Sequence, residues 1–204
     1  MIKKLTIPVD HGNRNMKTTH FLFTTGLSST DRKPAGREDF LQTDGKYYVL
    51  SGKRIPYQRD KTQDERFSIL TRFAIAKELE RTGQVSEEDV VQVSLPIGVP
   101  PKHYAELAER YREYFLGDGK VQELVYNGRT YHTCIQDVAV YPQAYAAMMT
   151  EGEKIRQIPK AVGIDIGGFT SDFLLMRSGS PCLDYCDSME KGVITMYNDI
   201  ISSV

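Results

Sequence analysis

The sequence has no long apolar run and no apolar stretch near its start. Nothing approaches the roughly 18 consecutive apolar residues of a membrane-spanning helix, so we expect no membrane partner. The first residues carry two lysines, Lys3 and Lys4, but the chain turns polar at residues 11–13 without the apolar core of a signal peptide. These absences favour a cytoplasmic protein.

Cysteine is scarce as well. The three cysteines, Cys134, Cys182 and Cys186, are an odd number without paired CxxC spacing, so we do not expect a disulfide framework. This usage fits a reducing compartment. Cys182 and Cys186 could hold a metal, but no matching Cys or His pair follows them, and we favour free thiols.

Neither sign of charge is in excess. The chain has 26 basic and 27 acidic side chains and a formal net charge of −1, whereas direct nucleic-acid binders usually cluster lysine and arginine. We therefore expect no direct nucleic-acid contact, and any link to DNA would run through a partner protein. With 204 residues, 40% of them hydrophobic, the chain can form one large domain or two small ones.

The apolar pattern predicts alternating strands and helices, and hence an α/β protein. Asp44-Gly45 and Asn127-Gly128 lie between apolar runs and predict tight hairpins. The expected strands are residues 5–9, 18–23, 40–42, 46–50, 90–95, 121–126, 130–135, 138–140, 161–165 and 173–176. The expected helices are 62–82, opened by a Thr62–Glu65 capping box, 101–116, 143–150 and 190–203. A turn-rich link is expected at 96–101, and Gly152 is expected to end the third helix.

Two glycine turns are the most informative feature. The first is residues 10–17 (DHGNRNMK) and the second is residues 165–172 (DIGGFTSD). Each has an aspartate at the end of an apolar strand and a glycine two residues later. Neither is a GxxxxGK[ST] phosphate loop or a GxGxxG dinucleotide motif. Together they predict two hairpins that grip one triphosphate.

The residue types in these turns suit a nucleoside triphosphate. Successive backbone N–H groups in a tight turn bind anionic oxygen, and glycine lets the backbone approach it closely. Lys17 would place its charge on the β and γ phosphates, and Asp10 and Asp165 would hold a hydrated Mg²⁺. The predicted nucleotide contacts are Asp10, Gly12, Asn13, Arg14, Asn15, Lys17, Gly167, Gly168, Phe169 and Thr170. Arg14 could instead be a solvated turn residue, and His11 either donates to a phosphate or is an ordinary residue.

Both turns resemble the first and second phosphate loops of the actin, sugar-kinase and heat-shock ATPase superfamily. Residues 44–49 (DGKYYV), 56–62 and 69–79 are most similar to plasmid-segregation actins of the ParM/StbA type. The resemblance covers essentially the whole chain. It implies an actin-like, ribonuclease H-like ATPase fold, with a mixed β-sheet flanked by helices.

The resemblance also implies an activity. Members hydrolyse ATP or GTP with Mg²⁺, polymerise into filaments and act in plasmid segregation in the bacterial cytoplasm, some with a DNA-binding adaptor protein. Gln143 falls where the family's connecting helix places a water-orienting residue, so Gln143 and Asp165 are the expected catalytic residues. Many ParM-like proteins carry Glu there, and a neutral amide orients water without serving as a general base. We therefore expect slow hydrolysis, triggered by closure or polymerisation.

The chain departs from the family pattern after the second turn. Nothing after Asp165 matches the family's adenosine-holding glycine motif or its second connecting helix, so the second domain is expected to be truncated and to expose apolar sheet surface. The predicted domains are residues 1–155, with a small upper subdomain at about 30–88, and residues 156–204. Residues 53–61 are expected either to make filament contacts or to form a solvated loop.

Two other functions stay open. The chain could be a non-catalytic scaffold that binds nucleotide only to assemble, or a small-molecule kinase of the same superfamily. A kinase would need a catalytic aspartate and a substrate-binding insertion, and the short middle segment and Gln143 speak against it.

Overall fold

The computed structural model describes residues 1–36 and 39–203, and the chain divides into two compact units. Unit 1 comprises Met1–Ile97 and Tyr111–Ala139, and unit 2 comprises Gly98–Arg110 and Val140–Val204. Three elements have residues in both units: β8 (Val90–Val99), α2 (Tyr104–Leu116) and β10 (Arg129–Pro142). The predicted domain boundary at residue 155 remains a prediction.

Unit 1 is built on a mixed seven-stranded sheet in the order β1-β8-β10-β9-β6-β7-β5. Strand β1 runs parallel to β8, whereas β9, β6, β7 and β5 join through antiparallel pairs. A second sheet has the order β2-β3-β4. The remaining elements of this unit are β1 (Ile2–Thr6), β2 (Asp10–His11), β3 (Asn15–Lys17), β4 (Leu22–Thr24), β5 (Leu27–Thr30), β6 (Phe40–Thr43), β7 (Lys46–Leu50), α1 (Arg66–Thr82) and β9 (Gln122–Tyr126).

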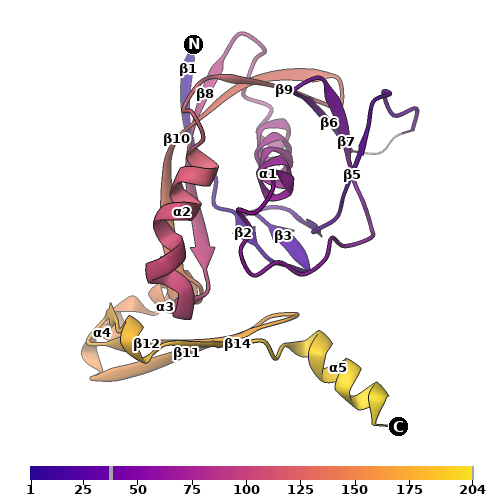
Figure 1. The fold of residues 1–204 in the computed structure, drawn as a ribbon. Coiled ribbons are helices and arrows are strands. Elements are labelled where there is room, and N and C mark those ends of the chain that lie inside the picture. The colour runs from indigo at the N-terminus through magenta and orange to yellow at the C-terminus, as the bar shows by residue number, and fades with distance from the viewer. Residues whose placement is uncertain (37–38, 204) are drawn as a thin grey trace. The chain divides into compact units, whose positions relative to one another are not determined.

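The core of unit 1 forms where the seven-stranded sheet curves around α1 (Figure 1). This helix is buried on most of its circumference, because apolar residues lie on more than one of its faces. Its buried apolar residues are Phe67, Ile69, Leu70, Phe73, Ala74, Ile75, Ala76 and Leu79. The helix ends at Gly83, whose φ of 61° is left-handed, as expected for a glycine stop.

Both predicted hairpins are confirmed. Asp44 and Gly45 join β6 to β7 with φ values of 51° and 76°, and Asn127 and Gly128 join β9 to β10 with 51° and 87°. Two successive positive φ values match the twist of the flanking strands. These turns therefore fix the register of four strands of the sheet.

Unit 2 contains a four-stranded sheet in which β11 and β14 both pair with β12. One face is covered by α3 and α4, with Ile155, Leu174 and Met176 at its buried centre. On β11, Val162, Ile164 and Ile166 are 59%, 59% and 65% exposed, so apolar sheet surface is exposed as expected. The other elements are the 3₁₀ turns Pro101–His103 and Leu183–Tyr185, α3 (Tyr145–Met149), α4 (Gly152–Gln157), β11 (Lys160–Ile166), β12 (Ser171–Arg177), β13 (Ser180–Pro181), β14 (Asp187–Met189) and α5 (Val193–Ser202).

The prediction of a Thr62–Glu65 capping box is wrong. Helix α1 begins at Arg66, and Glu65, which precedes it, makes no side-chain cap. Thr62 is held by Asp60, whose Oδ1 accepts from both its N–H (2.9 Å) and its hydroxyl (2.7 Å). Asp64 accepts a hydrogen bond from the Arg66 N–H at 2.9 Å, and so satisfies a free N–H at the start of the helix as Thr62 was expected to do.

The turn-rich link at 96–101 is also wrong, because β8 continues to Val99 through Pro96. Proline is tolerated here because the continuous pairing of β1 with β8 ends at Ser94, before Pro96. The Pro96 carbonyl accepts a hydrogen bond from the Val9 N–H at 2.9 Å.

Two further expectations need correction. The expected strand at 18–23 is interrupted by bends, and only β4 (Leu22–Thr24) follows β3. The expected helix at 143–150 is only α3, and Gly152 begins α4 rather than ending its predecessor. No helix within the described residues is both long and apolar enough to cross a membrane.

Candidate functional site

The first glycine turn is a tight hairpin between β2 and β3. Asp10 lies directly opposite Lys17, and the Lys17 ammonium is 2.9 Å from Asp10 Oδ2. The two side chains are 41% and 56% exposed, so both can reach a ligand. A Cβ on Gly12 would lie 2.5 Å from the Asn15 carbonyl oxygen, so only glycine fits there.

The carbonyl groups of this turn are bonded to donors from elsewhere in unit 1. The hydroxyl of Thr25 donates to Gly12 O at 2.6 Å, and its N–H donates to Arg14 O at 3.0 Å. The Lys61 ammonium donates to His11 O. A trans peptide holds its C=O and N–H on opposite sides. The N–H groups that follow these carbonyls, in Gly12, Asn13 and Asn15, therefore point away from Thr25 and Lys61.

The Asn13 side chain is also engaged within unit 1. Its Oδ1 accepts from the Gln58 N–H at 3.0 Å, and Gln58 Nε2 donates to Asp64 Oδ2 at 2.8 Å. Asn13 is thereby tied to the segment before α1. Its backbone N–H, rather than its amide oxygen, is the group suited to an anionic ligand.

The His11 side chain lies in the core and is fully buried. Its ring stacks on Phe115 with centroids 4.4 Å apart, and its Nε2 lies 2.7 Å from Thr71 Oγ1. Because the Thr71 hydroxyl donates to Phe67 O, Nε2 carries the proton and Nδ1 is left without a hydrogen-bond partner among the described residues. Burial, and secondarily the charge of Lys61, holds the pKa of His11 well below its ordinary value of 6.5. The phosphate-donor alternative for His11 is therefore wrong.

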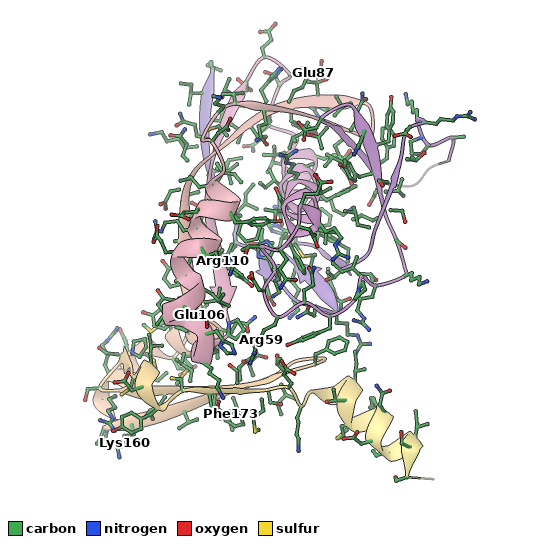
Figure 2. All side chains as sticks on the ribbon, viewed as in Figure 1. Arg59, Glu87, Glu106, Arg110, Lys160 and Phe173 are labelled. Carbon is green, nitrogen blue, oxygen red and sulfur yellow. The ribbon has the colours of Figure 1, made fainter. Side chains whose placement is uncertain are left out.

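Sequence reasoning missed three residues that hold the first turn: Thr25, Gln58 and Lys61. Lys61 is only 4% exposed, so it is not part of the solvated or filament-contacting loop expected at 53–61. Arg59, two residues earlier on the same connection and labelled in Figure 2, is exposed. The signal for Lys61 is absent from the sequence because the lysine follows a run of polar and charged residues typical of a solvated loop.

The second glycine turn, in unit 2, joins β11 to β12 (Lys160 and Phe173 mark these strands in Figure 2). Asp165 lies directly opposite Asp172, and the turn closes with a Gly167 N–H to Thr170 O bond of 2.8 Å. Asp165 is exposed, whereas Asp172 is buried with the Thr170 hydroxyl 3.2 Å from its Oδ2. Asp165 is therefore the carboxylate available to a bound cation.

The start of α5 is bonded to this second turn. The N–H groups of Val193 and Ile194 donate to Gly167 O (3.0 Å) and Gly168 O (2.8 Å). A Cβ on Gly192 would lie 2.5 Å from both Gly168 C and Phe169 N. Two of the predicted contacts, Gly167 and Gly168, thus have their carbonyls fixed by the helix.

Gln143 lies in the turn that follows β10 and does not open a helix. Its N–H donates to Val99 O at 2.8 Å, and the next residue, Ala144, has a left-handed φ of 67° before α3 begins. A Cβ on Gly98 would lie 3.2 Å from Gln143 Cγ, so the glycine leaves room for this side chain. The backbone of Gln143 is thus held just after β10 in unit 2, the unit that also contains Asp165 and its turn.

The predicted site residues thus fall into two groups. The first turn, in unit 1, brings together Asp10, Gly12, Asn13, Arg14, Asn15 and Lys17. Unit 2 carries Gly167, Gly168, Phe169, Thr170, Asp165 and Gln143. Among the residues described, no group of three or more His, Cys, Asp or Glu side chains is arranged for metal binding. The roles assigned to these residues remain predictions.

Comparisons with known proteins decide the family. The sequence matches the family described as actin-like proteins, N-terminal domain, over residues 8–145, more than half of the chain. The chain belongs to this actin-like family. The resemblance inferred from the two turns is confirmed, and so is the actin-like fold with its mixed sheet. The search of curated proteins returned no match.

Solved structures of actin-like proteins have the same fold. The ParM protein of pSK41 without nucleotide is 15% identical, with a TM-score of 0.75 over 98% of this chain and 70% of the other. An AlfA filament bound to AMPPNP is 15% identical, with a TM-score of 0.70 over 98% and 78%. The archaeal actin homologue Ta0583 in complex with ADP is 20% identical, with a TM-score of 0.71 over 98% and 64%. At these identities the likeness shows the actin-like fold alone.

Proposed function

We propose that this actin-like chain binds Mg-ATP or Mg-GTP through its two glycine turns, hydrolyses the nucleotide slowly and assembles with copies of itself into filaments that serve plasmid segregation. Two proteins of similar fold support this proposal: AlfA forms a filament bound to AMPPNP, and Ta0583 forms a complex with ADP. A DNA-binding adaptor would supply the link to DNA, since the chain has a net charge of only −1. The expected place of action is the bacterial cytoplasm.

The observation that carries the proposal is the orientation of the peptide groups in the first turn. Three of its carbonyls are occupied by Thr25 and Lys61, and the N–H groups of Gly12, Asn13 and Asn15 point the other way. Successive N–H groups of a tight turn can form an anion-binding concavity. Lys17 adds an exposed ammonium next to this turn.

The donor set suits magnesium as well as phosphate. Mg²⁺ keeps most of its waters and binds through one or two carboxylates plus phosphate oxygens. Asp10 and Asp165 each lie in the strand that leads into a glycine turn, and both carboxylates are accessible. When bound, the ion neutralises charge on the phosphates, and Asp10 and Asp165 would hold it through water.

Gln143 would orient the attacking water. Its amide can donate and accept a hydrogen bond, but it does not take up a proton at neutral pH, so it positions the nucleophile without acting as a general base. Its backbone is fixed by Val99 and its side chain lies beside Gly98. Slow turnover follows from this choice of residue.

Removing the carboxylate of Asp165 tests the proposal. Asp165→Ala should lower Mg-nucleotide affinity or phosphate release at least about tenfold, because one carboxylate leaves the ion's hydration shell. The matched control is Asp184→Ala, which removes another exposed aspartate of unit 2. Light scattering and phosphate release are measured together after addition of Mg-ATP or Mg-GTP.

The outcomes distinguish the proposed hydrolase from the non-catalytic scaffold and the small-molecule kinase. Scattering with release in the wild type, and loss of release only in Asp165→Ala, supports the proposal. Assembly without release favours the non-catalytic scaffold, and release only with an added metabolite favours the kinase. Normal turnover by Asp165→Ala would show that the second turn has been misassigned.

A further inference from the structure

The first turn is held by two buried residues that are not among its predicted nucleotide contacts. Thr25, between β4 and β5, is fully buried and bonds to both Gly12 O and Arg14 O. Lys61, before α1, is 4% exposed and bonds to His11 O. Three carbonyls of one hairpin are therefore bonded by two residues from separate parts of the sequence: the Lys61 and Thr25 side chains bond His11 O and Gly12 O, and the Thr25 backbone N–H bonds Arg14 O.

We propose that Thr25 and Lys61 are positioning residues: they set the peptide orientation of the first turn so that its N–H groups face phosphate oxygens. The inference deepens the proposed function and rests on it. A peptide whose carbonyl is bonded in the core cannot rotate without breaking that bond, and a buried carbonyl left without a partner is costly. The N–H groups of Gly12 and Asn13 are thus held in place before any ligand arrives, which is how a binding site avoids an ordering cost.

Thr25 is itself fixed on both sides. Its own carbonyl accepts from the Ile55 N–H at 2.9 Å. A Cβ on the adjacent Gly26 would lie 2.2 Å from Ser51 O and 2.5 Å from Lys53 O, so the backbone here is pressed against the connection after β7. Thr25 therefore acts as a rigid link between that connection and the turn.

Lys61 adds a charge behind the turn. Its backbone N–H donates to Tyr111 Oη at 3.1 Å, and its ammonium lies 5.6 Å from the centre of the Phe67 ring. A cation bonded to the His11 carbonyl polarises that peptide, which makes the Gly12 N–H on the other side a stronger donor. Lys61 thus acts on an anionic ligand through the peptide rather than by touching it.

The test compares matched variants. Thr25→Val keeps the volume and removes the hydroxyl, Thr25→Ser restores a hydroxyl, and Lys61→Met keeps the length and removes the charge. The controls are Thr19→Val and Lys53→Met, which change exposed residues of the same types. Binding of Mg-ATP, Mg-GTP and Mg-tripolyphosphate is measured by titration calorimetry well below the melting temperature of each variant, and the Gly12 amide is followed by ¹⁵N NMR.

We expect Thr25→Val and Lys61→Met to bind all probes about tenfold or more weakly, with Thr25→Ser and both controls within about threefold of the wild type. The ligand-induced shift of the Gly12 amide should be lost in Thr25→Val and regained in Thr25→Ser, which a merely structural role would not produce. If Lys61→Met does not fold, the Thr25 pair decides.

The failures are distinguishable. If the wild type binds none of the three probes, the proposed function fails and the positioning role falls with it. If the wild type binds but Thr25→Val and Lys61→Met bind equally well, only the positioning role is overturned. A loss that Thr25→Ser does not restore, or that the controls share, also overturns it.

Discussion

Single residues of the first turn show what burial does to polar groups. Asp10, Gly12 and Lys17 can be assigned from the sequence because an aspartate at a strand end, a glycine and a lysine have local meaning. Lys61 and Thr25 cannot, because their roles depend on which carbonyl lies beside them after folding. His11 differs from both, because the alternation of neighbouring side chains along a strand could have indicated that its ring enters the core while Asp10 stays accessible.

The titration of His11 gives a prediction at this scale. Its pKa is lowered in the fold by burial and by Lys61, so the folded chain keeps the ring neutral while the unfolded chain takes up a proton below about pH 6.5. The contribution of the neutral, buried His11 ring to the free energy of unfolding is fully present well above pH 6.5. It is lost as the pH falls through 6.5 toward the lowered pKa of the folded state. Between pH 7.5 and 5.5 the wild type should lose on the order of 1 kcal/mol of unfolding free energy from this residue.

Urea unfolding followed by tyrosine fluorescence checks this loss, with His11→Phe as the comparison because it removes the titration and keeps an aromatic ring in the core. The pH window lies above the range in which Asp64 and Glu78 titrate. A hydrogen bond from Arg66 lowers the pKa of Asp64. Burial raises the pKa of Glu78, but hydrogen bonds from Thr18 and His20 outweigh it and lower that pKa, so the stability from both carboxylates is lost only at more acid pH. A wild type as stable at pH 5.5 as at 7.5 would mean that His11 accepts its proton in the folded state.

At the scale of elements, the predictions that succeeded rest on local backbone chemistry. Hairpins at Asp44-Gly45 and Asn127-Gly128 need two positive φ values that these residue pairs supply. Those that failed depend on competition between neighbours. Thr62 donates its hydrogen bonds to Asp60 and does not cap α1. Nothing in the sequence marks Ala144 as a residue with a left-handed φ.

Helix α5 supplies a prediction of its own. It has 10 residues and no buried side chain, and isolated helices of that length are marginal in water. Its anchor is the second turn, through Val193 and Ile194, and the N–H of Gly192 donates to Thr195 Oγ1. Gly192→Ala would force a Cβ into the Gly168–Phe169 peptide and should cost about 1–2 kcal/mol of local stability, the size of a lost cap.

Hydrogen exchange read by mass spectrometry measures this directly. Peptides covering residues 193–202 should exchange about tenfold faster in Gly192→Ala, because about 1.4 kcal/mol corresponds to that factor. Asn198→Ala, on the exposed face of the same helix, is the control. Unchanged exchange in Gly192→Ala would mean that α5 does not depend on its contact with the turn.

At the scale of the whole molecule, the family and the fold followed from two short motifs and the order of elements between them. An aspartate–glycine turn after a strand is ambiguous once, but its second occurrence more than 150 residues later restricts the fold to few architectures. What the sequence could not supply is the set of core bonds that orient the first turn, because long-range contacts leave no local pattern. That the two turns bind one triphosphate remains a proposal.

Coupling of hydrolysis to assembly is a property of many chains together. If neighbouring chains trigger the slow reaction, phosphate release per chain should rise with chain concentration above the assembly threshold and stay near zero below it. Gln143→Ala should remove most of that rise, by about tenfold or more, while nucleotide-dependent scattering persists, because the amide is proposed to orient water and lies outside the two turns proposed to bind nucleotide. Gln157→Ala, an exposed glutamine of α4, is the control. Phosphate release that is proportional to concentration at all levels would show that single chains hydrolyse unaided, and loss of scattering in Gln143→Ala would place its role in structure instead of chemistry.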